Sequence, residues 1–330
     1  MESLHVLGRA LMTAIPSTKR VTIFGGSGFL GRHIVRALAN DGWRIRVATR
    51  RPNNANFLTP MGRVGQIQLL KVNVRDEDGV RAALKDADAA INLAGILYQT
   101  GRQRFDSIHV EGAARIARLT AELGVPRLLH VSSLGANAET RAKYAKSKAE
   151  GERAVREAYP TATIFRPSAV FGPEDDFFNK FAWLARMSPV LPVIGGGGTR
   201  LQPVFVGDVA QAAACALREQ STAGETFELG GPEIMTLKEI MELVLKVTHR
   251  RRMLLPIPFA LARIQGTVLG ILPKPLITRD QVRLLESDNV VSEGARGFRD
   301  LAITPEAAEA IVPSYLWRFR KHGQFEPVAP

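Results

Sequence analysis

A glycine-rich segment near the start of the chain constrains the fold more than any other feature. Residues 25–31 read Gly-Gly-Ser-Gly-Phe-Leu-Gly and follow the short apolar run 21–24. That run is long enough for a buried strand. Gly25 permits a tight turn, Gly28 lets a phosphate approach the backbone, and Gly31 lets a following helix pack closely. The segment predicts a strand, a turn and a helix whose N-terminus faces a pyrophosphate.

The alternative is a glycine-rich turn that binds nothing. The spacing is G-x-x-G-x-x-G, which differs from the commonest dinucleotide fingerprint, G-x-G-x-x-G. The context favours binding, because a second strand is predicted at 44–49, after the helix. We therefore predict that the whole segment contacts a dinucleotide through Gly25, Gly26, Ser27, Gly28, Phe29, Leu30 and Gly31.

Two arginines at the end of the second predicted strand bear on the identity of the dinucleotide. An NAD site places a carboxylate about 20 residues after the glycines, where it binds the ribose 2′-hydroxyl. Here the sequence has Arg50 and Arg51 instead. Guanidinium groups match a phosphate in charge and in the geometry of their donors. The pair favours NADP(H), with NAD(H) as the alternative if the arginines are only solvated.

Strands and helices alternate through the first half of the chain. Strands are predicted at 21–24, 44–49, 67–72, 89–93, 127–132 and 161–166, and helices at 76–85, 106–123 and 142–158. Such alternation indicates βαβ units with right-handed crossovers. The predicted fold class is α/β, a Rossmann-type doubly wound parallel sheet, with a smaller, interwoven C-terminal α/β domain.

Ligands of such sheets bind beyond the carboxyl ends of the strands. Small or polar residues stand at these ends, although a serine there can also simply cap a turn. Further predicted cofactor contacts are Asn73, Val74, Leu93, Ala94, Gly95, Ser132, Tyr144, Lys148, Pro167, Ser168 and Val170.

The predicted organisation is an N-terminal arm (1–19), a dinucleotide-binding domain (20–172) and a smaller C-terminal domain (173–330). Residues 200–230 are expected to return to the first domain, with strands at 202–206 and 227–229. Asp208 is predicted to cap the helix after the first of these strands, and Thr236 to cap a helix over 236–248.

A possible catalytic pair lies in the predicted helix 142–158. Tyr144 and Lys148 are four residues apart, so they share one helix face. An ammonium group beside a phenol is expected to lower the phenol's pKa. Tyr144 could then exchange a proton while a nicotinamide exchanges hydride, with Lys148 also holding the ribose and Ser133 orienting the substrate. The alternative is an exposed, lysine-rich helix face.

The charge and cysteine content limit the other classes of function. The 330 residues have a formal net charge of +12 and one cysteine, which excludes an intramolecular disulfide. The histidines show no metal-ligand spacing, and no nucleic-acid module is evident. We therefore expect neither a metal nor a nucleic-acid partner.

Residues 253–272 are apolar and follow three arginines, which suits either a core helix or docking on a membrane or membrane-bound partner.

Several stretches resemble the short-chain dehydrogenase/reductase superfamily, and within its atypical branch the nucleotide-binding accessory subunits of respiratory complex I. The resemblance rests on the glycine turn, the Tyr144–Lys148 spacing, and residues 130–137, 166–175, 202–208 and 277–280. It implies a bacterial homologue that binds NADP(H) in a mainly structural role and has complex I subunits as partners. It also implies a peripheral place on the cytoplasmic face of the inner membrane, or the matrix side in a mitochondrion. The intact Ser133, Tyr144 and Lys148 leave open an active reductase or epimerase on a small carbonyl or quinone-related substrate.

Overall fold

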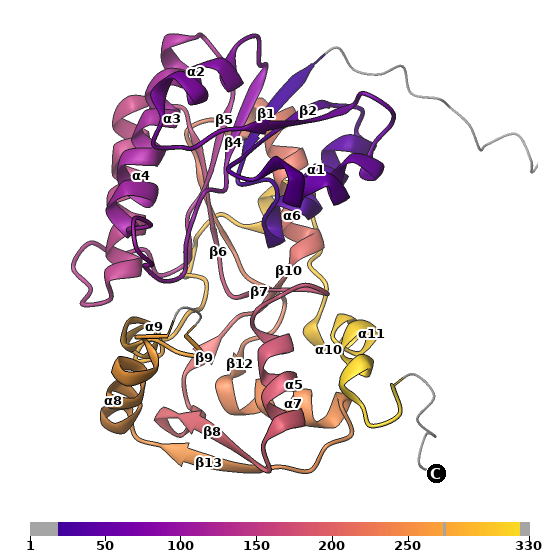
Figure 1. Ribbon diagram of the computed structural model, residues 1–330, viewed down its shortest axis with the longest axis vertical. Coiled ribbons are helices and arrows are strands. Elements are labelled where there is room, and N and C mark those ends of the chain that lie inside the picture. The colour runs from indigo at the N-terminus through magenta and orange to yellow at the C-terminus, as the bar shows by residue number, and fades with distance from the viewer. Residues whose placement is uncertain (1–18, 273–274, 324–330) are drawn as a thin grey trace, which may run out of the picture.

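The computed structural model describes residues 19–272 and 275–323. Figure 1 shows two stacked parts, an upper one built on a large sheet and a smaller lower one. Of the predicted N-terminal arm, residues 1–18 lie outside the described residues.

A seven-stranded sheet forms the centre of the upper part, and all its strand pairs are parallel. Its order is β11-β6-β5-β4-β1-β2-β3. The strands are β1 (Arg20–Phe24), β2 (Arg44–Thr49), β3 (Ile67–Lys71), β4 (Ala89–Asn92), β5 (Leu128–Val131), β6 (Thr163–Pro167) and β11 (Thr226–Leu229). The predicted doubly wound α/β class is confirmed.

Helices cover both faces of this sheet (Figure 1). On one face α1 and α6 share a core with the sheet, and on the other face α2, α3 and α4 do so. These helices are α1 (Phe29–Asn40), α2 (Glu77–Leu84), α3 (Glu111–Glu122), α4 (Lys143–Ala158) and α6 (Val206–Arg218). Because both faces are covered, strands β4 and β5 are buried at every residue.

The lower part combines short strand pairs with helices around its own core. The strand pairs are β7 (Val170–Phe171) with β10 (Val204–Phe205), β8 (Val190–Ile194) with β13 (Met253–Ile257), and β9 (Arg200–Leu201) with β12 (Met235–Thr236). The helices are α5 (Phe178–Met187), α7 (Leu237–Val247), α8 (Phe259–Leu269), α9 (Arg279–Leu284), α10 (Ala308–Ile311) and α11 (Pro313–Leu316). Short 3₁₀ helices are η1 (Pro52–Met61), η3 (Gly195–Gly197), η4 (Gln220–Thr222), η5 (Phe298–Leu301) and η6 (Trp317–Phe319).

The chain crosses between the two parts more than once. After leaving the sheet at β6 it forms α5 and β8 below, then returns through α6, and β11 pairs with β6 at the sheet edge. A segment from the second half of the chain therefore completes the dinucleotide-type sheet.

Three sequence expectations need correction. Of the strand expected at 202–206, only Val204–Phe205 (β10) is a strand, and β9 ends before it at Leu201. Asp208 is not a cap: α6 starts at Val206 after Phe205, and the Asp208 carboxylate instead accepts a hydrogen bond from the distant backbone amide of Glu306. The helix expected at 106–123 opens with one π-helical turn, η2 (Asp106–Val110), before α3. The predicted Thr236 cap of α7 is confirmed, with a capping box to Glu239.

The apolar segment 253–272 forms β13 and α8, and α8 lies at the surface. Its residues Ala262 and Gly266 face inward. The opposite face exposes Leu261, Ile264 and Val268, and Ile271 after the end of the helix is 84% exposed. The helix therefore packs into a small core on its inner face and is exposed on its outer face. No helix in the described ranges is long and apolar enough to cross a membrane.

Candidate cofactor and active site

The glycine turn has the backbone geometry that dinucleotide binding requires. Gly25 has a φ of 82°, and a Cβ there would lie 3.0 Å from the backbone of Leu93 at the end of β4. A Cβ on Gly31 would lie 2.6 Å from the backbone of Gly26. Gly31 therefore lets α1 start directly against the turn. Neither position accepts a side chain without a shift of the backbone.

The N-terminus of α1 is available to an anion. Gly28 is its N-cap residue, and no side chain caps the helix. The backbone amides of Phe29, Leu30 and Gly31 therefore lie in the first turn without a capping partner. With the positive end of the helix dipole, these amides suit a pyrophosphate.

The end of β2 lies beside the turn. The hydroxyls of Ser27 and Thr49 are 3.1 Å apart, and Thr49 Oγ1 accepts a hydrogen bond from the backbone amide of Arg51. The side chains of Arg50 and Arg51 are exposed, and among the described residues no ion pair or hydrogen bond occupies either guanidinium. The structure thus places two unpaired cations at the strand end where an adenosine ribose lies in this fold class.

The ends of β3 and β4 form the next part of the path. Asn73 follows β3, and its side-chain oxygen accepts from Arg75, while the carbonyl of Val74 accepts from Arg115. After β4, a Cβ on Gly95 would lie 3.9 Å from Lys148 Nζ. The segment Leu93, Ala94 and Gly95 therefore connects the glycine turn with the predicted catalytic pair.

The remaining predicted contacts divide into two groups. Ser132 and Ser133, at the end of β5, have buried hydroxyls with no hydrogen-bond partner in the described part of the chain. By contrast, the Ser168 hydroxyl donates to Asn289 Oδ1 at 2.7 Å, so Asn289 engages it. Pro167 ends β6, and Val170 begins β7.

Unpaired buried polar atoms test whether a ligand fits here. Within the described residues these atoms are Arg32 Nε, Ser132 Oγ and Ser133 Oγ. Arg32 follows the last glycine of the turn, and the two serines follow β5. Buried polar groups normally have partners. Orphan atoms at both ends of the predicted cofactor path therefore fit a bound dinucleotide and substrate.

Lys148 lies on the inward-facing side of α4 and is buried. Its ammonium donates a 3.0 Å hydrogen bond to the carbonyl of Val131 at the end of β5. Burial lowers the pKa of Lys148 to about 8, against the opposing effect of Glu152. Glu152 is itself paired with Arg166 at 2.6 Å. The lysine is thus held at the carboxyl ends of the strands and can gain or lose its proton near neutral pH.

The expected low pKa of Tyr144 is wrong in this structure. Burial raises the pKa of the Tyr144 phenol, and the nearby Ser133 hydroxyl opposes this rise, although no hydrogen bond of ordinary geometry joins the two. Desolvation penalises the phenolate more than its neighbours favour it. The Tyr144 phenol therefore stays protonated at neutral pH, with Ser133 beside it.

His109 is a site residue that the sequence did not indicate. Its Nε2 accepts a 3.0 Å hydrogen bond from the backbone amide of Ile96, and its Nδ1 lies 2.8 Å from the Ser147 hydroxyl. Burial, with a smaller effect of Lys148, lowers the pKa of His109 to about 3. The ring is therefore neutral and stacks on Phe105, which meets Tyr144 edge to face. The one available signal in the sequence was a histidine inside the predicted helix 106–123, which does not by itself indicate a place beside Tyr144.

Asp280 lies in the stretch 277–280 that carries the family resemblance, but no local sequence pattern assigned it a role. Its two carboxylate oxygens accept hydrogen bonds from the backbone amides of Lys143 and Tyr144, at 2.7 and 2.9 Å. The carboxylate thus caps the first turn of α4 from the beginning of α9. A negative charge at this helix terminus is favourable. Asp280 therefore fixes the start of the helix that presents Tyr144.

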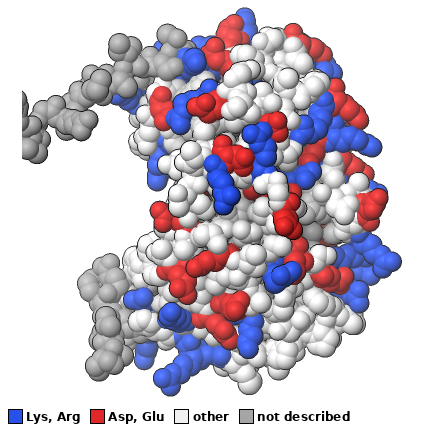
Figure 2. Space-filling view, turned by 180° about the vertical axis from the view of Figure 1, so that it is seen from behind, with Lys and Arg blue, Asp and Glu red and all other residues white. Residues whose placement is uncertain are grey.

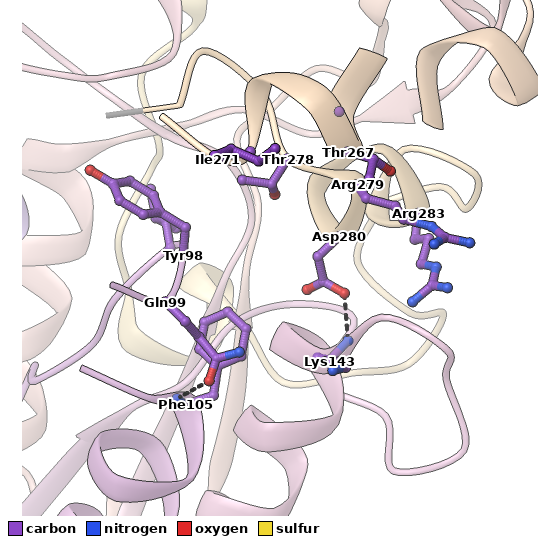
Figure 3. A pocket seen from close by; sticks show the side chains of 13 residues that line it. Tyr98, Gln99, Phe105, Lys143, Thr267, Ile271, Thr278, Arg279, Asp280 and Arg283 are labelled. Carbon is purple, nitrogen blue, oxygen red and sulfur yellow. Dashed lines mark hydrogen bonds between the residues drawn. The ribbon is translucent and has the colours of Figure 1, made fainter. Parts of the chain in front are cut away.

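A cavity of about 470 Å³ lies in front of this helix end, between the loop after β4 and the helices α8 and α9. Figure 3 shows Tyr98, Gln99 and Phe105 on one side of it and Lys143, Asp280 and Arg283 on the other. Since Phe105 contacts Tyr144, the cavity adjoins the proposed catalytic group. No group of three or more His, Cys, Asp or Glu side chains in the described residues is placed to hold a metal ion.

The fold and the glycine turn define an α/β protein of the dinucleotide-binding, doubly wound class. Residues 21–230 match the model of the NAD dependent epimerase/dehydratase family. The chain belongs to that family, and to the group of relatives within it named as subunit 9 of the alpha subcomplex of NADH dehydrogenase (ubiquinone).

Three relatives illustrate this assignment. The mitochondrial "NADH dehydrogenase [ubiquinone] 1 alpha subcomplex subunit 9" of Arabidopsis thaliana is 34% identical over 96% of this chain and 81% of its own length. The mitochondrial NADH-ubiquinone oxidoreductase 40 kDa subunit of Neurospora crassa is 33% identical over 92% and 80%. A ceramide reductase of Caulobacter vibrioides is 37% identical over 58% of each chain.

Solved structures support the fold. A UDP-glucose 4-epimerase of Thermotoga maritima, in a structure with UDP-glucose, has a TM-score of 0.69 and 18% identity, and covers 92% of this chain and 99% of the other. A UDP-glucose 4-epimerase of Thermus thermophilus in complex with NAD has a TM-score of 0.62 and 20% identity over 90% and 98%. At such identities the likeness concerns the fold alone.

Proposed function

We propose that this chain is an NADP(H)-binding accessory or assembly subunit of respiratory complex I, in which the cofactor is mainly structural. The observation that supports this most is the similarity to complex I subunits over nearly the whole chain, including the C-terminal part outside the family model. A ligand bound only by the folded state stabilises that state by mass action. In this proposal residues 20–172 form the domain that binds the cofactor, and residues 173–330 form the smaller C-terminal domain.

The preference for NADP(H) rests on Arg50 and Arg51. Both are exposed and unpaired at the end of β2, and no carboxylate occupies their place in the sequence. Bidentate contacts of arginine with phosphate are strong and geometrically specific. These two side chains would hold the 2′-phosphate, and the amides of Phe29 and Leu30 the pyrophosphate.

The exposed face of α8 supports a peripheral location, on the cytoplasmic face of the inner membrane or the mitochondrial matrix side. Leu261, Ile264 and Val268 are exposed at helical spacing on α8, and the exposed Ile271 follows the end of the helix. Exposed apolar stripes of this size are typical of docking on a membrane or a membrane-bound partner. Elsewhere, basic and acidic side chains are interspersed on the face shown in Figure 2, so the excess of positive charge is distributed.

Purification from native membranes tests the accessory role. A tagged chain, expressed at its normal level and solubilised mildly, should co-purify with complex I subunits and release NADP(H) on denaturation. The double variant Ile264→Ser/Val268→Ser should reduce membrane recovery, whereas Lys85→Ser/Arg299→Ser, at exposed positions of the upper part, should not. Recovery of the unmodified chain free of complex I subunits would contradict the proposal.

A second candidate function is an active reductase or epimerase on a carbonyl substrate. It is favoured by the unpaired Ser132 and Ser133 hydroxyls next to Tyr144 and Lys148. Ser133 lies beside Tyr144, where a substrate oxygen would meet both hydroxyls. The similarity to a ceramide reductase over part of the chain adds support.

The chemistry can be assigned to this chain's own residues. The nicotinamide, when bound, supplies or accepts the hydride. Tyr144, protonated at neutral pH, would donate its phenolic proton to the carbonyl oxygen, and Ser133 would orient that oxygen. Lys148, fixed by Val131, would hold the ribose and favour the phenolate that forms.

A substrate screen that follows NADPH oxidation tests this second function. Tyr144→Phe should abolish turnover while leaving NADPH affinity within about twofold. Tyr159→Phe is the matched control, because Tyr159 ends the same helix and donates to Val125, away from the site. Turnover that survives Tyr144→Phe would contradict the assigned mechanism.

A further inference from the structure

The cavity in front of α4 has one charged side that no acidic residue neutralises. Lys143, Arg279 and Arg283 line it, and Arg279 and Arg283 share one face of α9 because they are four residues apart. Among the described residues, the Arg283 guanidinium donates only to the backbone carbonyl of Arg141. No ion pair or side-chain hydrogen bond occupies Lys143 or Arg279 there.

The single acidic side chain in the cavity wall is already engaged. Asp280 accepts two backbone amides of α4, one with each oxygen. It therefore does not pair with the three cations. Figure 3 shows its carboxylate directed at the start of α4, whereas the side chains of Arg279 and Arg283 extend on the side of Asp280 away from Tyr98. The wall consequently presents a net positive charge to a ligand.

The cavity lining also has apolar members. Leu97 and Phe105 come from the loop after β4 and Ile271 from the end of α8, and Leu97 and Ile271 are 53% and 84% exposed. Ile271 follows the end of α8, and Val268 and Ile264 of that helix are exposed as well, so exposed apolar side chains continue from the cavity along α8. An alkyl chain that starts in the cavity could lie along this surface and remove it from water.

One glycine makes this arrangement possible. A Cβ on Gly266 would lie 2.8 Å from the backbone nitrogen of Arg279. Gly266 therefore lets α8 approach the start of α9 closely. This contact brings the apolar end of α8 and the cationic face of α9 to the same cavity.

We propose that this cavity binds an amphiphile with an anionic head group, held by Lys143, Arg279 and Arg283, and an alkyl chain that lies along Leu97, Ile271 and α8. The cavity adjoins Tyr144 through Phe105, so the amphiphile would be the substrate class of the second candidate function, and this part of the inference rests on that function. Binding of the amphiphile does not require turnover, so the binding site and the enzymatic function can be tested separately.

Calorimetric titration of the full chain with octyl, decyl and dodecyl phosphate, each below its micelle concentration, tests the proposal. Affinity should rise with chain length, by up to about fourfold per buried methylene. Arg279→Ala/Arg283→Ala should weaken dodecyl phosphate by at least about tenfold, from the loss of two charged contacts. Ile271→Ser should reduce the chain-length dependence, whereas the exposed pair Lys85→Ala/Arg299→Ala should leave both unchanged.

Two further ligands distinguish the source of the head group. Inorganic phosphate should bind far more weakly than dodecyl phosphate, and octyl glucoside, which lacks charge, more weakly than octyl phosphate. Equal affinity for inorganic and dodecyl phosphate would overturn the amphiphile site. Binding to anionic phosphatidylglycerol vesicles without any binding of monomeric alkyl phosphate would also overturn it, in favour of a surface that docks on lipid. Alkyl phosphate binding without NADPH turnover would support the site and contradict the second function.

Discussion

The carboxylate of Asp280 accepts a 2.9 Å hydrogen bond from the backbone amide of Tyr144, which lies 136 residues earlier in the chain. The same carboxylate accepts the amide of Lys143. A residue of the lower part of the molecule thus caps the helix of the upper part that presents the proposed proton donor. The position of Tyr144 relative to β5 consequently depends on the packing of α9.

Removal of this cap should loosen the start of α4. We expect Asp280→Ala to lower the free energy of unfolding by about 1–2 kcal/mol, a usual effect of losing an N-cap. Amide hydrogen exchange of residues 143–146 should become faster, while exchange in the sheet should not. Asp280→Asn, with one carbonyl oxygen, should retain part of the protection. Unchanged exchange at 143–146 in Asp280→Ala would show that the contact does not hold the helix.

Two glycines of the turn should respond differently to the same substitution. A Cβ on Gly31 meets backbone at 2.6 Å, whereas one on Gly28 meets only Gly25 O, at 3.3 Å, and Gly28 has an ordinary φ of −75°. Gly31→Ala should therefore cost about 1–3 kcal/mol of stability through overpacking. Gly28→Ala should fold normally but bind NADP(H) at least about tenfold more weakly, because a methyl group occupies the approach of the pyrophosphate. Urea unfolding and nucleotide titration measure the two effects, and normal affinity in Gly28→Ala would contradict the assigned approach.

The 2′-phosphate assignment predicts a selective loss of affinity. Arg50→Ala/Arg51→Ala should weaken NADPH by at least about a hundredfold, since two charged hydrogen bonds of about 1.5 kcal/mol or more each are lost. NADH, which lacks that phosphate, should change by no more than about threefold. Equilibrium titration of both nucleotides gives the ratio. An equal loss for both would assign the arginines to a shared part of the dinucleotide.

Two buried histidines should make the fold sensitive to acid. Burial lowers the pKa of His109 and of His130 to about 3 each, from an ordinary value of 6.5. The unfolded chain therefore takes up protons below pH 6.5 that the folded chain does not, and stability falls as the pH falls from 6.5 towards 3. At pH 5 each histidine should account for about 2 kcal/mol relative to neutral pH.

Urea unfolding at pH 7, 6 and 5 measures this loss. His109→Gln should reduce the slope of stability against pH, whatever its effect at pH 7, because only its titration is removed. His322→Gln, at an exposed position of the C-terminal part, is the control and should leave the slope unchanged. An equal slope in His109→Gln and the unmodified chain would contradict the assignment of the acid sensitivity to this residue.

Much of the upper part followed from local sequence patterns. Buried runs bounded by turns predicted the six strands of the first half, and each lies within about two residues of its observed bounds. The turn at residues 25–31 could be predicted because steric limits within a few residues require glycine at these positions. The spacing of Tyr144 and Lys148 likewise placed them on one helix face without any tertiary information.

The wrong expectations have one cause, which is contact with a segment distant in the sequence. Asp208 is a residue type that often caps helices, but its carboxylate accepts a hydrogen bond from the backbone amide of Glu306, 98 residues later. Ser168 looks like a free strand-end hydroxyl, but it donates to Asn289. The pKa of Tyr144 depends on how much surrounding structure excludes water from it, which no spacing within α4 expresses.

The sequence by itself determined the class of fold, the dinucleotide-type turn and the face of α4 that bears Tyr144 and Lys148, because backbone sterics and helical periodicity act over short stretches. Only the tertiary structure decided that Asp280 caps α4, that His109 lies neutral beside Lys148, and that α8 exposes an apolar stripe next to a cationic cavity. These features arise from contacts between distant segments, and burial and charge at each of them are properties of the packed chain.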